Sequence, residues 1–93
     1  MNNFKEIIKS DEKVLVKFGA SWCGPCRIVD KVLGGLITEG FNNIHKVDVE
    51  ENPELGAEYM IRNLPTIIVF QNGEVVDRVN GIVNAQRVKK LLS

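Results

Sequence analysis

The sequence of 93 residues contains little cysteine: Cys23 and Cys26 are its two cysteines, and they stand three positions apart. Small secreted domains that depend on disulfides usually carry more cysteines at longer spacings. A disulfide between such close residues closes a very short loop, so it restricts the unfolded chain only slightly. Zinc needs four ligands, and His45 is the one histidine that could join the pair. The pair therefore indicates redox chemistry rather than fold stabilisation or a metal site.

The sequence also lacks an excess of charge of either sign. Its 12 basic and 12 acidic residues give a formal net charge of +0, and lysine and arginine do not cluster as they do on nucleic-acid-binding surfaces. The longest apolar run, Ile67 to Phe70, is far shorter than the ~18–20 residues that span a bilayer. No apolar signal segment follows Met1. We therefore expect a cytoplasmic protein that binds neither nucleic acid nor membrane.

The length and the composition predict a single domain over residues 1–93. Apolar residues make up 44% of the chain, which is enough for one packed core. No large apolar excess remains beyond that core and the surroundings of the cysteine pair, so we expect a monomer.

Alternating helical and strand patterns predict an α/β fold. Helices that lie between strands favour right-handed crossovers and parallel pairing, and Asn72-Gly73 is a strong hairpin signal that adds one antiparallel strand. We therefore expect a four-stranded mixed sheet with helices on both faces. The expected strands are 14–18, 44–49, 66–70 and 74–79, and the expected helices are 4–10, 23–39, 53–61 and one that starts after Asn84.

Caps and breaks mark the ends of these helices. We expect Asn2 or Asn3 to cap the first helix, Asn52 to cap the third and Gly40 to end the second. The second helix also contains Gly34-Gly35, a weakness of roughly 1 kcal/mol per glycine against alanine, which close packing against a neighbour would explain. The expected buried residues are Ile28, Val29, Val32, Leu33, Leu36 and Ile37 in the second helix, and Leu55, Tyr59 and Met60 in the third.

Several motifs resemble those of the thioredoxin family. The segment Trp22-Cys23-Gly24-Pro25-Cys26 follows a buried strand, opens a helix and matches the active-site motif of the family in full. Further along, Arg62-Asn63-Leu64-Pro65-Thr66 resembles the family's loop that ends in a cis-proline, Phe70-Gln71-Asn72-Gly73-Glu74 resembles its hairpin, and Gly81 resembles its glycine after the last strand. This resemblance covers nearly the whole chain. It implies a thioredoxin-like fold from which the first strand of the family is missing, because no strand pattern precedes the first helix.

The position of Cys23 suits a nucleophile in thiol–disulfide exchange. The reactive species is the thiolate, and a free cysteine with a pKa of about 8.5 is mostly protonated at pH 7. The unpaired N–H groups and the dipole at a helix N-terminus should lower the pKa of Cys23. We therefore expect Cys23 to be exposed and to attack, and Cys26 to lie one turn inward and resolve the mixed disulfide. By resemblance, the Gly24-Pro25 turn is typical of a reducing enzyme.

The resemblance also implies a binding site for protein substrates. It places Pro65 opposite the cysteines, where a cis peptide would expose the backbone of Leu64 to an extended substrate. Trp22, Leu64 and Gly81 would form an apolar groove around Cys23. The implied partners are proteins with disulfides and an upstream electron donor similar to thioredoxin reductase. No cofactor is expected, because the dithiol is itself the redox centre.

Lys17 is the most informative departure from the family. Thioredoxins usually carry a buried aspartate at this position, and they commonly have a tryptophan where Gly19 stands. A neutral Lys17 could act as a base, a charged Lys17 would stabilise a Cys26 thiolate, and a third option is that its side chain reaches the surface. Either Asp30 or Asp48 could pair with it.

Lys31 and Lys46 occupy two further family positions. Lys31 stands where the family has a proline that kinks the long helix, and Lys46 matches the lysine that usually faces the aspartate. Two other functions stay open. A glutaredoxin-like enzyme that uses glutathione has the active-site motif against it, and a binding module with vestigial redox activity would follow if the change at Lys17 had disabled the chemistry.

Overall fold

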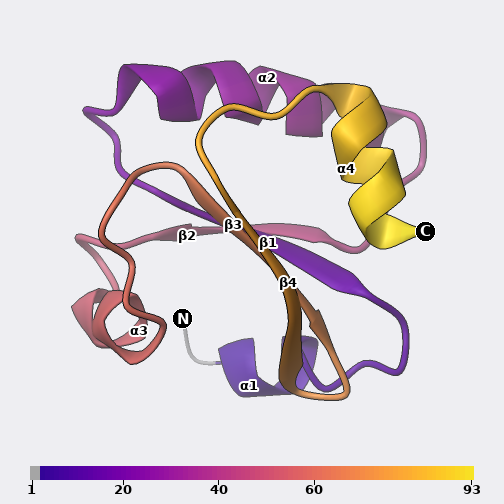
Figure 1. The fold of residues 1–93 in the computed structure, drawn as a ribbon, viewed down its shortest axis with the longest axis horizontal. Helices are drawn as coiled ribbons and strands as arrows, with labels where there is room; N and C mark the ends of the chain where they lie inside the picture. Colours follow the sequence, from indigo (N-terminus) through magenta and orange to yellow (C-terminus); the bar gives the residue numbers. More distant parts are fainter. Residues whose placement is uncertain (1–2) are drawn as a thin grey trace.

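The computed structural model describes residues 3–93, and one mixed sheet forms its centre (Figure 1). The strand order in this sheet is β2-β1-β3-β4. In the described part of the chain, α1 is the first element and no strand precedes it. The elements are α1 (Phe4–Ile7), β1 (Val14–Gly19), α2 (Gly24–Thr38), β2 (Ile44–Asp48), α3 (Pro53–Glu58), β3 (Thr66–Gln71), β4 (Glu74–Asn80) and α4 (Ala85–Leu92).

Helices cover both faces of the sheet, as the sequence predicts. Figure 1 shows α2 and α4 on one side and α1 and α3 on the other. Strand β1 serves both sides because successive side chains point to opposite faces. Leu15 packs into the core under α2 and α4, whereas Val16 and Phe18 pack with Phe4 of α1 and Leu55 of α3.

The direction of β3 differs from the expectation. Strand β1 pairs in parallel with β2, but it pairs antiparallel with β3, and β3 pairs antiparallel with β4. The six residues of α3 rise only about 9 Å, while the five residues of β2 span about 16 Å. Helix α3 is therefore too short to carry the chain back to the edge of the sheet where β1 and β2 begin, which a parallel β3 would require. Thr66 begins β3 beside Phe18, at the end where β1 and β2 finish.

Local signals predicted several boundaries correctly. Asn84 caps α4, since its side chain accepts a hydrogen bond from the N–H of Arg87 at 2.8 Å. Asn72 and Gly73 both have positive φ, as a tight hairpin requires. Asn3 and Asn52 occupy the N-cap positions of α1 and α3 as predicted, but neither side chain makes a capping hydrogen bond, and Asn2 lies outside the described residues. The side-chain amide of Asn52 instead donates to the carbonyl of Asp48.

Helix α2, which carries the cysteines, runs unbroken to Thr38 with Lys31 inside it. Gly40 has φ +114 and lets the N–H of Phe41 reach the carbonyl of Leu36, so the helix ends at this glycine as predicted. The inner face of α2 is narrower than expected. Val29, Leu33 and Leu36 are buried, but Ile28 and Ile37 are 51% and 45% exposed because they lie at the edges of that face.

The Gly34-Gly35 pair has no close neighbour, which contradicts the packing explanation. A Cβ added at either glycine would meet no atom within 4 Å apart from the backbone of α2 itself. We therefore expect Gly35→Ala to stabilise the protein by about 1 kcal/mol, because alanine restricts the unfolded chain and favours the helix. Urea unfolding measures this change. Gly40→Ala is the matched control: space is equally open there, but the positive φ should make the substitution destabilising.

The ends of α1 and α3 are earlier than predicted. Helix α1 stops at Ile7 and α3 stops at Glu58, so Met60 follows the third helix rather than belonging to it. Met60 has φ 50 and is 65% exposed, which contradicts its predicted inward orientation. The guanidinium of Arg78, on β4, donates to the carbonyls of Tyr59 and Met60. These bonds fix the chain where it leaves α3 toward the candidate site.

Candidate active site

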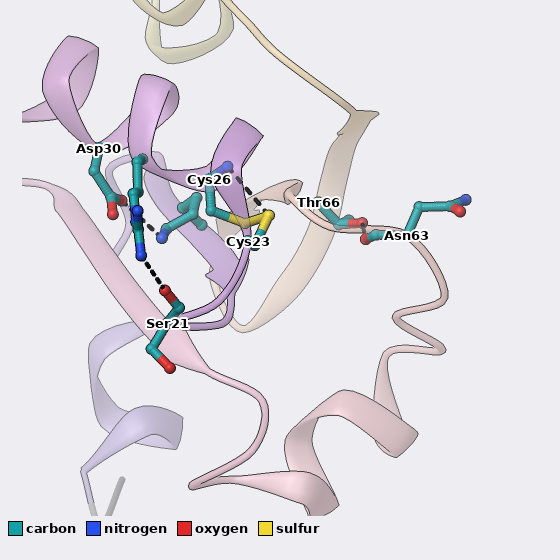
Figure 2. Close-up of a disulfide and its surroundings, with 8 residues drawn as sticks. Ser21, Cys23, Cys26, Asp30, Asn63 and Thr66 are labelled. Carbon is teal, nitrogen blue, oxygen red and sulfur yellow. Dashed lines mark hydrogen bonds and ion pairs between the residues drawn. A yellow bond between two sulfur atoms is a disulfide. The ribbon is translucent and has the colours of Figure 1, made fainter.

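The two cysteines meet at the N-terminus of α2, where they form a disulfide (Figure 2). Cys23 is the N-cap residue of this helix, and its Sγ accepts a hydrogen bond from the N–H of Cys26 at 3.2 Å. Pro25 occupies the first turn, where its missing N–H is not needed. The helix terminus therefore presents a donor to the sulfur of Cys23, which is the environment that favours a thiolate.

Cys23 is not exposed, which corrects the expectation from the sequence. Only 3% of the residue is accessible to solvent, against 1% for Cys26. In the disulfide, Cys23 packs with Ala20 and Cys26, and Leu64 covers this small cluster. A reagent therefore reaches Cys23 through the adjacent groove rather than from an open surface. The neighbouring Trp22, in contrast, is 66% exposed.

The loop before β3 approaches the cysteines from the opposite side, as the resemblance implies. The Leu64–Pro65 peptide is cis, and the side chain of Leu64 packs against the cysteine cluster. Two bonds fix this loop. The hydroxyl of Thr66 donates to the carbonyl of Asn63 at 2.6 Å, as Figure 2 shows, and the N–H of Gly81 donates to the carbonyl of Pro65 at 2.8 Å.

A groove of about 430 Å³ opens beside the disulfide. It brings together Trp22, Cys23 and Leu64 as the sequence predicts, but Gly81 is not one of its lining residues and instead donates its N–H to the carbonyl of Pro65. Sequence reasoning missed a second wall that comes from the end of β2 and the segment after α3. The complete lining is Trp22, Cys23, Gly24, Pro25, Val49, Ile61, Arg62, Asn63 and Leu64.

The signals for the second wall were present but weak. Val49 directly follows β2, and Ile61 and Arg62 directly follow the segment that Arg78 holds. An apolar residue just beyond a strand at the same sheet edge as the active-site loop is a candidate for such a wall. Only the pairing of β1 with β2, which aligns Gly19 with Asp48, shows that this edge is shared.

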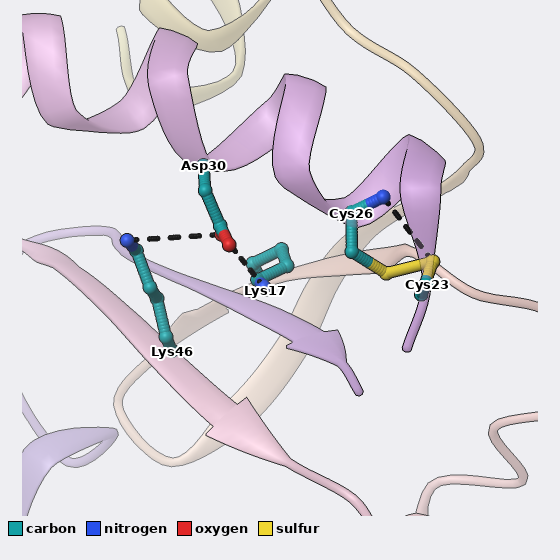
Figure 3. A network of polar contacts seen from close by, with 5 residues as sticks. All are labelled: Lys17, Cys23, Cys26, Asp30 and Lys46. Carbon is teal, nitrogen blue, oxygen red and sulfur yellow. Dashed lines mark hydrogen bonds and ion pairs between the residues drawn. A yellow bond between two sulfur atoms is a disulfide. The ribbon is translucent and has the colours of Figure 1, made fainter. Parts of the chain in front are cut away.

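Lys17 is buried on the other side of the disulfide, and the option that it reaches the surface is excluded. Its side chain is 7% exposed, and its Nζ lies 2.7 Å from Oδ1 of Asp30 on α2 (Figure 3). Lys46 of β2 approaches the same oxygen at 3.7 Å. Asp48, the other proposed partner, instead accepts a hydrogen bond from the N–H of Glu50 at 2.8 Å.

Gly19 makes room for this lysine. A Cβ at Gly19 would lie 2.8 Å from Lys17 Nζ and 3.1 Å from Cys26 Sγ. Lys17 Nζ and Cys26 Sγ thus both lie next to the position that a side chain at Gly19 would occupy. Any side chain there would displace one of them.

Other ionisable and metal-binding groups offer no competing site. In residues 3–93, no set of three or more His, Cys, Asp and Glu side chains is placed to hold a metal ion. Burial lowers the pKa of His45, which lies on β2 away from the cysteines. Across the same residues, none of the helices combines the length and apolarity that crossing a membrane requires.

A disulfide that is held at a helix N-terminus and opens onto a groove can exchange with the thiols and disulfides of another molecule. The fold and the cysteine pair together define the class of protein: a thiol–disulfide oxidoreductase with a thioredoxin-like fold.

Comparisons with known proteins agree. The family model Thioredoxin matches residues 1–93. A thioredoxin from Porphyra purpurea is 41% identical over 91 residues, covering 96% of this chain and 85% of that protein. A bifunctional thioredoxin reductase/thioredoxin from Mycobacterium leprae is 41% identical over 80 residues, covering 84% of this chain and 18% of that protein. The structure of a mutant thioredoxin from Halobacterium salinarum matches with a TM-score of 0.87 at 32% identity, covering 99% of this chain and 81% of that one. The chain belongs to the thioredoxin family.

Proposed function

We propose that this chain reduces disulfides in other proteins, with Cys23 as the nucleophile and Cys26 as the resolving residue. The Cys23 thiolate attacks one sulfur of the substrate disulfide, and the other substrate sulfur leaves as a thiolate that takes a proton from solvent. The Cys26 thiolate then attacks Cys23 and releases the second substrate sulfur. Two electrons pass to the substrate, and the Cys23–Cys26 disulfide remains.

The observation that carries this assignment is the unequal access to the two sulfurs. Cys23 lines the groove, whereas Cys26 does not and lies one helical turn deeper. An incoming disulfide can therefore meet Cys23 first. Cys26 is then held at bonding distance for an intramolecular second step, which is faster than any second collision.

The groove supports binding of an extended substrate segment. Leu64 lines the groove beside Cys23, and the next residue, Pro65, accepts a hydrogen bond at its carbonyl from the N–H of Gly81. A segment that lies along Leu64 can pair with backbone groups, so recognition depends little on the substrate's side chains. The exposed indole of Trp22 lies in the groove with Gly24 and Pro25 of the active-site turn. It can contact apolar side chains of the substrate next to the substrate's reacting cysteine.

The reaction also needs a source of electrons. The Mycobacterium leprae relative joins a thioredoxin reductase and a thioredoxin in one protein, which supports an upstream reductase as the donor for this chain. We propose that the chain acts as a single domain and a monomer, with the dithiol as its redox centre and no bound cofactor. The use of two cysteines in one active-site pair supports a reducing compartment such as the cytoplasm.

Reduction of insulin by dithiothreitol tests the proposal. The wild-type protein should accelerate precipitation of the insulin B chain, and the Cys23→Ser/Cys26→Ser variant should not exceed dithiothreitol alone. Absence of acceleration by the wild type would exclude the reductase. Activity that requires glutathione would favour a glutaredoxin-like enzyme, and retained binding of partners without turnover would favour a binding module.

A further inference from the structure

We propose that Lys17 is a buried positioning residue whose ammonium group stabilises the thiolate of Cys26 and thereby favours the reduced dithiol. Asp30 holds the lysine in this position. The inference deepens the proposed function and rests on it for the resolving role of Cys26. It assigns to this chain a cation in the place where its relatives are expected to carry an acid.

The geometry places the charge beside the inner sulfur. Lys17 Nζ and Cys26 Sγ lie 2.8 Å and 3.1 Å from the same point, the Cβ position of Gly19, so they are separated by no more than about 6 Å. Within that distance a cation lowers the pKa of an acidic group, because it interacts more favourably with the anion than with the neutral form. Burial strengthens this interaction, since little water screens it.

The ion pair explains why Lys17 stays charged. An isolated ammonium group at this depth would be costly, and the carboxylate of Asp30 at 2.7 Å removes most of that cost. The side chain of Asp30 is 35% exposed, so its own charge remains partly hydrated. Water screens the carboxylate on its outer side, whereas the ammonium group faces the interior next to Cys26.

Other charged groups of both signs lie around this site. Asp30 Oδ1 is shared with Lys46 of β2, so two cations surround one carboxylate. Asp48 lines a small cavity together with Lys17, Asp30 and Lys46, and its carboxylate, which accepts a hydrogen bond from the N–H of Glu50, adds a second negative charge. The side chain of Arg27, also on α2, donates to the carbonyl of Ser21 at the rim of the site. Strand β3 contributes only the apolar Ile67 opposite Lys17.

Two consequences follow for the reaction. The Cys26 thiolate is more abundant near neutral pH, so it attacks the Cys23–substrate disulfide sooner. The charge acts on the thiolate but has no anion to stabilise in the disulfide, so it favours reduction of the pair. The wild-type protein should therefore be a weaker reductant than the same chain with a neutral residue in place of Lys17.

The first test is the equilibrium constant for reduction of the Cys23–Cys26 disulfide by dithiothreitol. Lys17→Met keeps the length of the side chain and removes its charge. At pH 8.5 the constant should fall about five- to tenfold in this variant, and at pH 6, where the thiols are protonated, it should hardly change. Lys46→Met is the matched control: it removes the same charge next to Asp30 from a side chain that is 44% exposed, and it should change the constant less than about twofold.

A direct titration makes the result independent of substrate turnover. In Cys23→Ser, the absorbance of the remaining thiolate reports Cys26 alone, and adding Lys17→Met should raise the pKa of Cys26 by about one unit. An unchanged titration, with circular dichroism showing both variants folded, would overturn the proposal. That outcome is distinct from failure of the proposed function, which would appear as absence of insulin reduction by the wild type.

Discussion

Cys26→Ser should retain its protein substrates as covalent adducts, whereas Cys23→Ser should retain none. In Cys26→Ser the first attack by Cys23 is intact, but no second thiolate is present to break the mixed disulfide. In Cys23→Ser the remaining thiol lies at the bottom of the site, where Leu64 and the rest of the cluster cover it. Insulin reduction should fall to the uncatalysed background in both variants, yet only one should trap its partner.

The measurement is mass spectrometry of each variant after incubation with oxidised insulin and quenching with acid. An adduct that dithiothreitol removes is expected for Cys26→Ser alone. If both variants formed adducts equally, the unequal access to the two sulfurs would not determine their roles. The reverse pattern would assign the nucleophile to Cys26 and would contradict the mechanism proposed above.

The sequence predicted the elements that surround Cys23 correctly, but it did not predict the burial of Cys23. The active-site motif, the cis-proline loop and the hairpin are local patterns, and each lies where the sequence placed it. Burial of Cys23 depends on how Leu64, distant along the chain, packs against it. A helix N-terminus is normally an exposed place, so the sequence alone favoured the opposite answer.

The direction of β3 was predicted wrongly for a similar reason. A helix between two strands usually signals a parallel crossover, but that rule needs a helix long enough to travel along the sheet. The predicted third helix, 53–61, is longer than the observed Pro53–Glu58. Its last predicted residues adopt a turn with Met60 at positive φ, which no local cap signal announced.

The partner of Lys17 shows where sequence reasoning ends. Side chains alternate along β1, so Lys17 lies on the same face as Leu15 and Gly19, and in the structure Gly19 leaves space there for the ammonium group. The sequence left both Asp30 and Asp48 open as partners of Lys17. The structure selects Asp30, since Asp48 is used by the turn that follows β2. Such competition for a carboxylate is decided by backbone geometry and not by residue type.

Asp30→Asn should destabilise the folded protein by about 2 kcal/mol, which corresponds to a fall in Tm of roughly 10 °C for a domain of this size. The substitution keeps the shape of the side chain but leaves the buried ammonium group of Lys17 without its counter-ion. It also leaves Lys17 and Lys46 facing each other across a neutral group. A fully buried pair would lose more, but the side chain of Asp30 is partly exposed.

Lys17→Met should cost less than about 1 kcal/mol, because it replaces a buried cation with an apolar side chain of similar length and Asp30 can still pair with Lys46. The double variant Lys17→Met/Asp30→Asn should therefore resemble Lys17→Met and recover most of the loss. Urea unfolding of the four proteins gives the coupling energy of the pair. If Asp30→Asn cost no more than Lys46→Met, the ammonium group of Lys17 would have to leave the interior or lose its charge when Asp30 is neutral. A large loss that Lys17→Met reverses would instead show that the cation stays buried beside Cys26, which is the condition for its action on the thiolate.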